Sequence, residues 1–171
     1  MIGKKSMFSR KTAIVTMSDL GSRGLREDRS GQALAERLGA EGYDVCSRTV
    51  IPDDYDRIKE VLIELCDTEG AALIVTTGGT GVSPRDVTPD ATVSVIEKSV
   101  PGLAEAMRAA SMQKTPHAMI SRAVAGIRGK TLIINLPGSP KGAIENLEAI
   151  LAALPHALDK IQGDPSDCAQ G

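Results

Sequence analysis

The sequence predicts an α/β protein built around a mostly parallel sheet. Short β-branched runs alternate with segments whose apolar residues recur at helical spacing, the order typical of strand–helix–strand units. Three of these runs are almost continuously apolar, as expected for strands that are covered on both faces. The length of 171 residues fits one domain, and 42% apolar with 25% charged residues is typical of soluble globular proteins.

Four segments predict the strands of the sheet. They are residues 12–17 (TAIVTM), 45–51 (VCSRTVI), 72–77 (ALIVTT) and 131–136 (TLIINL). The stretch 111–129 is less regular, and its part AVAGIRG, residues 123–129, predicts a short hairpin or an edge strand.

Five segments predict helices. They are residues 32–40, 54–67, a helix that begins at Pro89-Asp90, 103–112 and 144–161. In the last segment, Leu and Ile recur every three or four residues, and Pro155 must kink or restart the helix because it lacks an N–H group. Asp53 or Asp54 is placed to cap the helix that follows, and Ser139 is a candidate cap for the last helix.

The two ends of the chain, residues 1–10 and 163–171, are polar and are expected to be flexible, with a single domain in 11–162. No apolar run approaches the roughly 20 residues that cross a bilayer, and the start lacks the apolar core of a secretory signal. Three widely spaced cysteines favour reduced thiols in the cytoplasm, with Cys46 and Cys66 expected as small buried residues.

Charge and aromatic content argue against nucleic acid as a partner. The 20 Lys and Arg residues against 22 Asp and Glu residues give a net charge of −2, and 2% of the residues are aromatic. Such a chain lacks a broad basic surface and the aromatic platforms on which bases stack. We therefore expect neither nucleic acid nor a membrane as a partner.

Each predicted strand ends in a segment rich in Gly, Pro, Asp or Ser. The four segments are residues 18–24, 52–54, 78–89 and 137–142. Because ligands bind outside the carboxyl ends of the strands in open α/β sheets, a parallel sheet would bring these segments together in one site.

The residues of these segments point to an anionic ligand. The glycines of TTGGTG, residues 76–81, would let N–H groups approach a phosphate closely, although a tight structural turn would use the same residues. Asp53 and Asp86 could hold Mg²⁺ together with substrate phosphates, but each could equally cap a helix or a turn, and Asp19 has the same two interpretations. Nearby Arg and Lys residues could attract an anion or be solvated surface charges.

Several stretches together match one family pattern. TTGGTGVSPRDVTP at residues 76–89, followed by LPGSPK at 136–141, is a specific combination. Further matching stretches are Ser18-Asp19, REDRSG at 26–31, VIPDD at 50–54, VPGLAE at 100–105 and SRAVAGIRG at 121–129. On these residues the chain resembles the Mog/MoaB family of molybdenum-cofactor biosynthesis proteins. It looks most similar to the molybdopterin adenylyltransferase branch and to the matching domain of gephyrin.

The resemblance implies a three-layer α/β/α sandwich that transfers AMP from ATP to the terminal phosphate of molybdopterin and releases pyrophosphate. It matches the family's catalytic carboxylates to Asp53 and Asp86, which we expect to hold Mg²⁺. The residues expected to bind molybdopterin and the nucleotide are Ser18, Asp19, Thr76, Thr77, Gly78, Gly79, Thr80, Gly81, Arg85, Gly138, Ser139, Pro140 and Lys141.

The resemblance also implies a homotrimer, with hexamers in the MoaB-like branch, and a separate protein that inserts molybdate. The presence of both Arg85 and Asp86 favours an active transferase. The alternative is a non-catalytic, MoaB-like carrier of molybdopterin. On the residues alone, a flavodoxin-like phosphate-binding domain is a further alternative, which the scarcity of aromatic residues disfavours.

Overall fold

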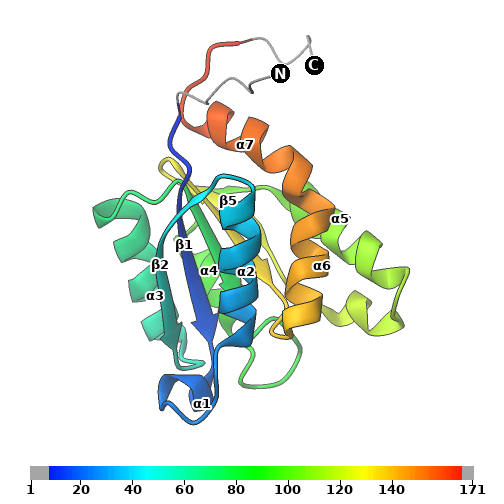
Figure 1. Cartoon of the computed structure of the whole chain (residues 1–171). Coiled ribbons are helices and arrows are strands. Elements are labelled where there is room, and N and C mark those ends of the chain that lie inside the picture. Colours follow the sequence, from blue (N-terminus) through cyan, green and yellow to red (C-terminus); the bar gives the residue numbers. More distant parts are fainter. Residues whose placement is uncertain (1–7, 167–171) are drawn as a thin grey trace.

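Six strands form one sheet within residues 8–166, the part of the chain that the computed structural model describes (Figure 1). The strands are β1 (Lys11–Met17), β2 (Asp44–Ile51), β3 (Leu73–Thr77), β4 (Lys98–Ser99), β5 (Ala125–Arg128) and β6 (Thr131–Leu136). Their order is β2-β1-β3-β6-β5-β4; β1, β2, β3 and β6 run parallel, and β5 and β4 are antiparallel additions at one edge. The four predicted strands are therefore confirmed. Of the two predictions for residues 123–129, the hairpin is confirmed, because β5 pairs antiparallel with β6, whereas the edge position is wrong, because the unpredicted strand β4 pairs with the other side of β5.

The predicted helices are all present, with shifted ends. The helices and helical turns are α1 (Asp19–Ser22), α2 (Arg29–Ala40), α3 (Tyr55–Ile63), the π-helical turn η1 (Glu64–Thr68), α4 (Thr88–Val95), α5 (Pro101–Met112), the 3₁₀ turn η2 (Pro116–Ile120), α6 (Pro140–Ile150), the 3₁₀ turn η3 (Leu151–Ala153) and α7 (Leu154–Ile161). The helix predicted over 54–67 is α at first and then continues as η1. α2 begins three residues before the predicted start because Asp28 caps it.

The sheet lies between two layers of helices (Figure 1). Leucines, alanines and isoleucines of α2, α5, α6 and α7 form one core with one face of the sheet. α3 and α4 form the second core with the other face. The three-layer α/β/α sandwich implied by the family resemblance is confirmed.

The continuous apolar runs follow from this double coverage. In β1, Ile14 belongs to the first core, whereas its neighbours Ala13 and Val15 belong to the second. Successive side chains of a strand point to opposite faces, so both faces of a central strand must be apolar. The edge strand β2 is largely exposed, which accounts for its more alternating sequence.

The last helical segment restarts at Pro155, as expected. α6 ends at Ile150, the turn η3 follows, and Pro155 lies in the first turn of α7. A proline is tolerated there because the first N–H groups of a helix have no intrahelical partner.

The ends of the described chain contact each other. The Ser9 amide donates to the Gln162 side chain at 2.9 Å, and Arg10 pairs with Asp159 at 2.7 Å. Residues 1–7 and 167–171 lie outside the described residues, so the expectation of flexible ends is not tested there. Within residues 8–166, no helix is both long and apolar enough to cross a membrane.

The structure corrects the expectation that both Cys46 and Cys66 are buried. Cys46 is exposed because it lies on the edge strand β2. Cys66 lies half-buried in η1, where burial raises the pKa of its thiol to about 11. Edge position is set by strand pairing, which the local sequence does not encode.

Candidate functional site

The carboxyl ends of the four parallel strands meet at one edge of the sheet, as predicted. The segments that follow them enclose a cavity of about 810 Å³, here called the edge cavity. The predicted residues that line it are Ser18–Asp19, Asp53, Thr77–Gly79, Asp86 and Gly138–Pro140. This volume lies in the range of small-molecule sites, and every one of the four predicted segments contributes to its wall.

Asp19 and Asp53 hold each other in place in the edge cavity. The Asp19 amide donates to Asp53 Oδ2 at 3.2 Å, and the Asp53 amide donates to Asp19 Oδ1 at 3.1 Å. Burial raises the pKa of Asp53 above its usual range, and the nearby Asp19 charge adds to the rise. The pKa of Asp19 is lowered, first by the hydrogen bond from the Asp53 amide and then by Arg85. The reciprocal bonds fix the spacing of the two carboxylates.

Asp53 is not the helix cap of α3, because Asp54 performs that role, and Asp19 is not a cap because Ser18 caps α1. The Asp54 side chain accepts a hydrogen bond from the Arg57 amide at 2.8 Å. The structure therefore resolves the two alternatives left by the sequence, and Asp53 is free to face the edge cavity.

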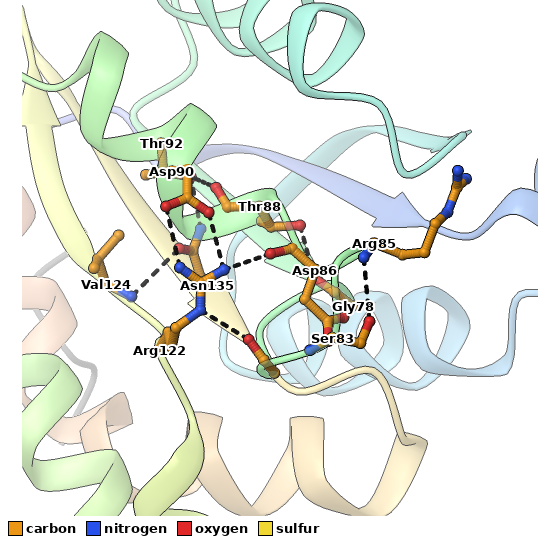
Figure 2. Close-up of polar contacts among 11 residues, drawn as sticks. Gly78, Ser83, Arg85, Asp86, Thr88, Asp90, Thr92, Arg122, Val124 and Asn135 are labelled. Atoms are coloured by element: carbon orange, nitrogen blue, oxygen red, sulfur yellow. Dashed lines mark hydrogen bonds and ion pairs between the residues drawn. The ribbon is translucent and has the colours of Figure 1, made fainter.

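Asp86 lies on the β3–α4 loop, residues 78–87 (Figure 2), and is part of the wall of the edge cavity. Its Oδ2 accepts a hydrogen bond from the Ser83 amide at 2.8 Å, and its own amide donates to the Ser83 carbonyl at 3.0 Å. Asp86 therefore caps a turn, which was one of its two interpretations, and it also lies in the wall of the edge cavity. The Oδ1 atoms of Asp86 and Asp53 accept no hydrogen bond within the described part of the chain.

Positions 78 and 79 accept only glycine, because of both their backbone conformation and the lack of space for a side chain. Their φ angles are +99° and +64°, in the region that side chains rarely adopt. A Cβ atom at Gly78 would lie 2.5 Å from the Met17 carbonyl oxygen. One at Gly79 would overlap the Thr88 hydroxyl and lie 3.1 Å from Asp53 Oδ1. The two glycines therefore let the loop turn directly beside the Asp53 carboxylate.

A buried polar network supports the base of the β3–α4 loop (Figure 2). The Asn135 amide nitrogen donates to the hydroxyls of Thr76 and Thr92, each at 3.0 Å. The Thr88 hydroxyl donates to the Gly78 carbonyl at 3.0 Å. Thr76 is fully buried in this network and does not line the edge cavity, although it was among the expected binding residues.

Four other expected binding residues also lie outside the edge cavity. Thr80 and Gly81 line a neighbouring hollow of about 300 Å³, which shares Ser139 with the edge cavity. Arg85 forms an ion pair with Asp19 and points away from the network around Arg122 (Figure 2). Lys141 is exposed on α6. Ser139 caps α6 by accepting from the Gly142 amide at 3.0 Å, as expected.

Residues 26–30 were not among the expected binding residues, although REDRSG at 26–31 matches the family pattern and Arg26 and Arg29 were candidates for attracting an anion. All five of these residues line the edge cavity, and Ser30 reaches across to donate to the Gly138 carbonyl at 2.7 Å. Asp28 caps α2 and also accepts from the Thr16 hydroxyl at 2.9 Å. The signal was present, because a capping Asp before Ser-Gly marks a helix start at the carboxyl end of the sheet.

The charged residues in the wall of the edge cavity are mostly acidic. The five acidic residues are Asp19, Glu27, Asp28, Asp53 and Asp86, and the two basic residues are Arg26 and Arg29. Of the other basic residues near the predicted segments, Lys141 is exposed, as the solvated interpretation expects. That interpretation does not hold for Arg85, which pairs with Asp19, or for Arg108 and Arg122, which donate to backbone carbonyls. A polyphosphate in this cavity would meet net repulsion unless a cation came with it.

Three comparisons with known proteins agree with these observations. A family model described as a probable molybdopterin binding domain matches residues 13–156. A molybdopterin adenylyltransferase of Helicobacter pylori is 44% identical over 153 residues, covering 88% of this chain and 87% of the relative. Gephyrin of Dictyostelium discoideum is 40% identical over 162 residues, which cover 89% of this chain and 22% of gephyrin. The crystal structure of the molybdopterin biosynthesis enzyme MoaB from Thermus thermophilus has a TM-score of 0.86 and 50% identity, covering 94% of this chain and all of that one.

Proposed function

Because this chain belongs to the family of probable molybdopterin binding domains, we propose that it acts in molybdenum cofactor biosynthesis as a molybdopterin adenylyltransferase. In the proposed reaction, an oxygen of the terminal phosphate of molybdopterin forms a bond to the α-phosphorus of ATP. The bond between that phosphorus and the oxygen leading to the β-phosphate breaks, and pyrophosphate leaves with the electron pair. The product is adenylyl-molybdopterin.

The observation that carries this proposal is the meeting of Asp53, Asp86 and the Gly78-Gly79 turn in one cavity. They come from two different loops, and the edge cavity is large enough for a small-molecule ligand. Phosphoryl transfer leaves little covalent work to a protein, which must align two anions and offset their repulsion. A rigid cavity wall with fixed carboxylates and a close backbone turn suits that task.

Mg²⁺ fits the donor set of the cavity. The wall offers two carboxylate oxygens without hydrogen bonds, on Asp53 and Asp86, in an acidic surrounding. No group of three or more metal-ligating side chains occurs among the described residues, which suits an ion that takes its remaining ligands from phosphates and water. When bound, Mg²⁺ would neutralise phosphate charge and favour attack on the α-phosphorus.

The backbone of the glycine turn supplies part of the anion contact in this proposal. The Gly78 amide donates to the Leu136 carbonyl at 3.1 Å and is therefore engaged in the fold. The amides of Gly79 and Thr80 donate no hydrogen bond within residues 8–166. These two N–H groups are the donors that a phosphate oxygen would meet.

We further propose a homotrimeric or hexameric assembly in the cytoplasm, with a separate protein that inserts molybdate. Exposed apolar side chains on two elements that pack together support an assembly: Met112, Met119 and Ile120, in α5 and η2, are 45%, 64% and 51% exposed. Large exposed apolar side chains that lie near one another are common at contact surfaces. Light scattering behind size exclusion would measure the assembly, and a monomer would contradict it.

The function is tested by measuring pyrophosphate release from ATP, Mg²⁺ and molybdopterin. We expect release that requires molybdopterin, and a loss of about 100-fold or more in the Asp86→Asn variant, with molybdopterin still bound. Asp56→Asn is the matched control, because Asp56 is an exposed carboxylate on α3 outside the cavity wall. Near-normal turnover in Asp86→Asn would refute its metal role. Binding of molybdopterin without release by the wild type would instead support the carrier alternative.

A further inference from the structure

The side chain of Arg122 binds the β3–α4 loop and the helix behind it at three points (Figure 2). Nε donates to the Gly81 carbonyl at 2.8 Å, and Nη2 donates to the Asp86 carbonyl. Nη1 and Nη2 also form a fork with the two carboxylate oxygens of Asp90, at 3.0 and 2.9 Å. In addition, the Arg122 amide donates to the Thr80 carbonyl at 2.8 Å.

These contacts are the main attachment of the loop to the rest of the protein. Residues 80–86 make hydrogen bonds to other described segments only through Arg122 and through the exposed pair of Arg85 with Asp19. Arg122 lies 36 residues beyond Asp86 along the chain, between η2 and β5. The loop that carries Asp86 is thus fixed by a segment distant in sequence.

The guanidinium group is suited to this task by its shape. Four of its five N–H groups donate hydrogen bonds to the loop and to Asp90, in directions that a planar guanidinium provides. A lysine would keep the charge but could not reach three acceptors in fixed directions. The Arg122 and Asp90 side chains are 39% and 51% exposed, so their ion pair adds little to global stability.

We infer that Arg122 is a positioning residue, which sets the place of Asp86 in the edge cavity by clamping the β3–α4 loop between Gly81 and Asp90. The inference rests on the proposed function, in which Asp86 acts directly. Arg122 itself does not line the edge cavity, so it acts through the loop and not on the substrates. It also gives a role to the matching stretch SRAVAGIRG, which the proposed reaction leaves unused.

Arg128 provides a matched control within the same stretch. It forms a similar fork with Asp67, at 3.0 and 2.6 Å, and donates to the Val95 carbonyl at 3.1 Å. Val95 is the last residue of α4, at the opposite end from the β3–α4 loop. Substitution of Arg128 therefore removes a comparable set of contacts without touching the loop.

The test compares Arg122→Ala, Arg122→Lys and Arg128→Ala by three measurements on the full chain. These are steady-state pyrophosphate release, thermal unfolding, and hydrogen–deuterium exchange of a peptide that covers residues 78–90. We expect Arg122→Ala to lower kcat about 10- to 100-fold with KM for ATP little changed, because misplacement by a fraction of an ångström suffices. Arg122→Lys should not restore kcat, and Arg128→Ala should keep it. Exchange in residues 78–90 should be faster in both Arg122 variants only.

Two kinetic outcomes would overturn the inference. One is a kcat in Arg122→Ala equal to that of the wild type, whether or not its KM for ATP is raised. The other is an equal loss of kcat in Arg122→Ala and Arg128→Ala that matches an equal loss of thermal stability in the two variants. If Arg122→Ala does not fold, Arg122→Lys decides by the same criteria. If the wild type releases no pyrophosphate, the proposed function fails. Hydrogen–deuterium exchange then tests whether Arg122 holds the loop in place, and equal protection of residues 78–90 in all variants refutes that role.

Discussion

Replacement of Gly79 by alanine is expected to cost stability and activity together. An alanine at the φ angle of +64° would cost about 1 kcal/mol of stability, which is the lower end of the range for a side chain in left-handed backbone. The new Cβ would overlap the Thr88 hydroxyl, which is fully buried and donates to the Gly78 carbonyl. Displacing that hydroxyl loses a buried hydrogen bond, for roughly 1 to 1.5 kcal/mol more. We therefore expect a loss of about 2 to 2.5 kcal/mol in the free energy of unfolding.

The assay is urea unfolding at one fixed protein concentration, so that assembly contributes equally to every variant. Gly39→Ala is the matched control. Gly39 lies on an exposed part of α2, without a positive φ and with open space around its Cβ position. There alanine should stabilise the protein by about 0.5 to 1 kcal/mol, because glycine is a poor helix former.

The same Gly79→Ala variant tests the coupling between the turn and the site. The new Cβ would lie 3.1 Å from Asp53 Oδ1, closer than ordinary contact, so the carboxylate must move. We expect pyrophosphate release to fall by at least about tenfold. A variant that unfolds within about 0.5 kcal/mol of the wild type would refute the described loop conformation. Normal turnover with the expected instability would refute the coupling to Asp53 alone.

Three further predictions follow from the same geometry. In the magnesium-free protein, an NMR pH titration that follows the carboxyl carbon of Asp53 should give a pKa above the ordinary value of about 3.9. Asp19→Asn should lower the pKa of Asp53 because it removes the adjacent negative charge, and an unchanged pKa in the variant would contradict the role of Asp19. Asn135→Ala should lower the free energy of unfolding by about 2 to 4 kcal/mol in urea titrations, because it leaves a void and breaks the three hydrogen bonds of that side chain, with Thr76, Thr92 and the Val124 amide. A loss under 1 kcal/mol would speak against that network. A thiol reagent at pH 8 should label Cys46 before Cys66 in peptide mapping, because Cys46 is exposed and burial holds the pKa of Cys66 at about 11; the reverse order would contradict the described burial.

The sheet and its functional edge could be predicted because their signals are local and repeated. The apolar runs of β1, β3 and β6 indicated strands with two buried faces, and parallel pairing then placed the loops after them at one edge. Asp53 and Asp86 were predicted because they lie in the segments that follow β2 and β3, whose carboxyl ends reach the same edge of the sheet. Their catalytic and metal roles stay proposals.

Other features could not be predicted because they depend on which segments meet in space. Asp53 and Asp54 are equivalent as caps in the sequence, and only the helix start at Tyr55 gives that role to Asp54. Thr76 belongs to the glycine motif, yet its strand position turns it into the core toward Asn135. Cys46 is exposed because β2 has a neighbour on one side only.

The sequence by itself determined the α/β class, the four parallel strands and the position of the glycine turn, because side-chain period and glycine conformations are properties of neighbouring residues. Only the tertiary structure decided how the wall of the edge cavity is completed. Residues 26–30 close it, and Arg122 clamps the loop of Asp86 from 36 positions away. These contacts join segments that are far apart in the chain, and the packing of the whole fold sets them.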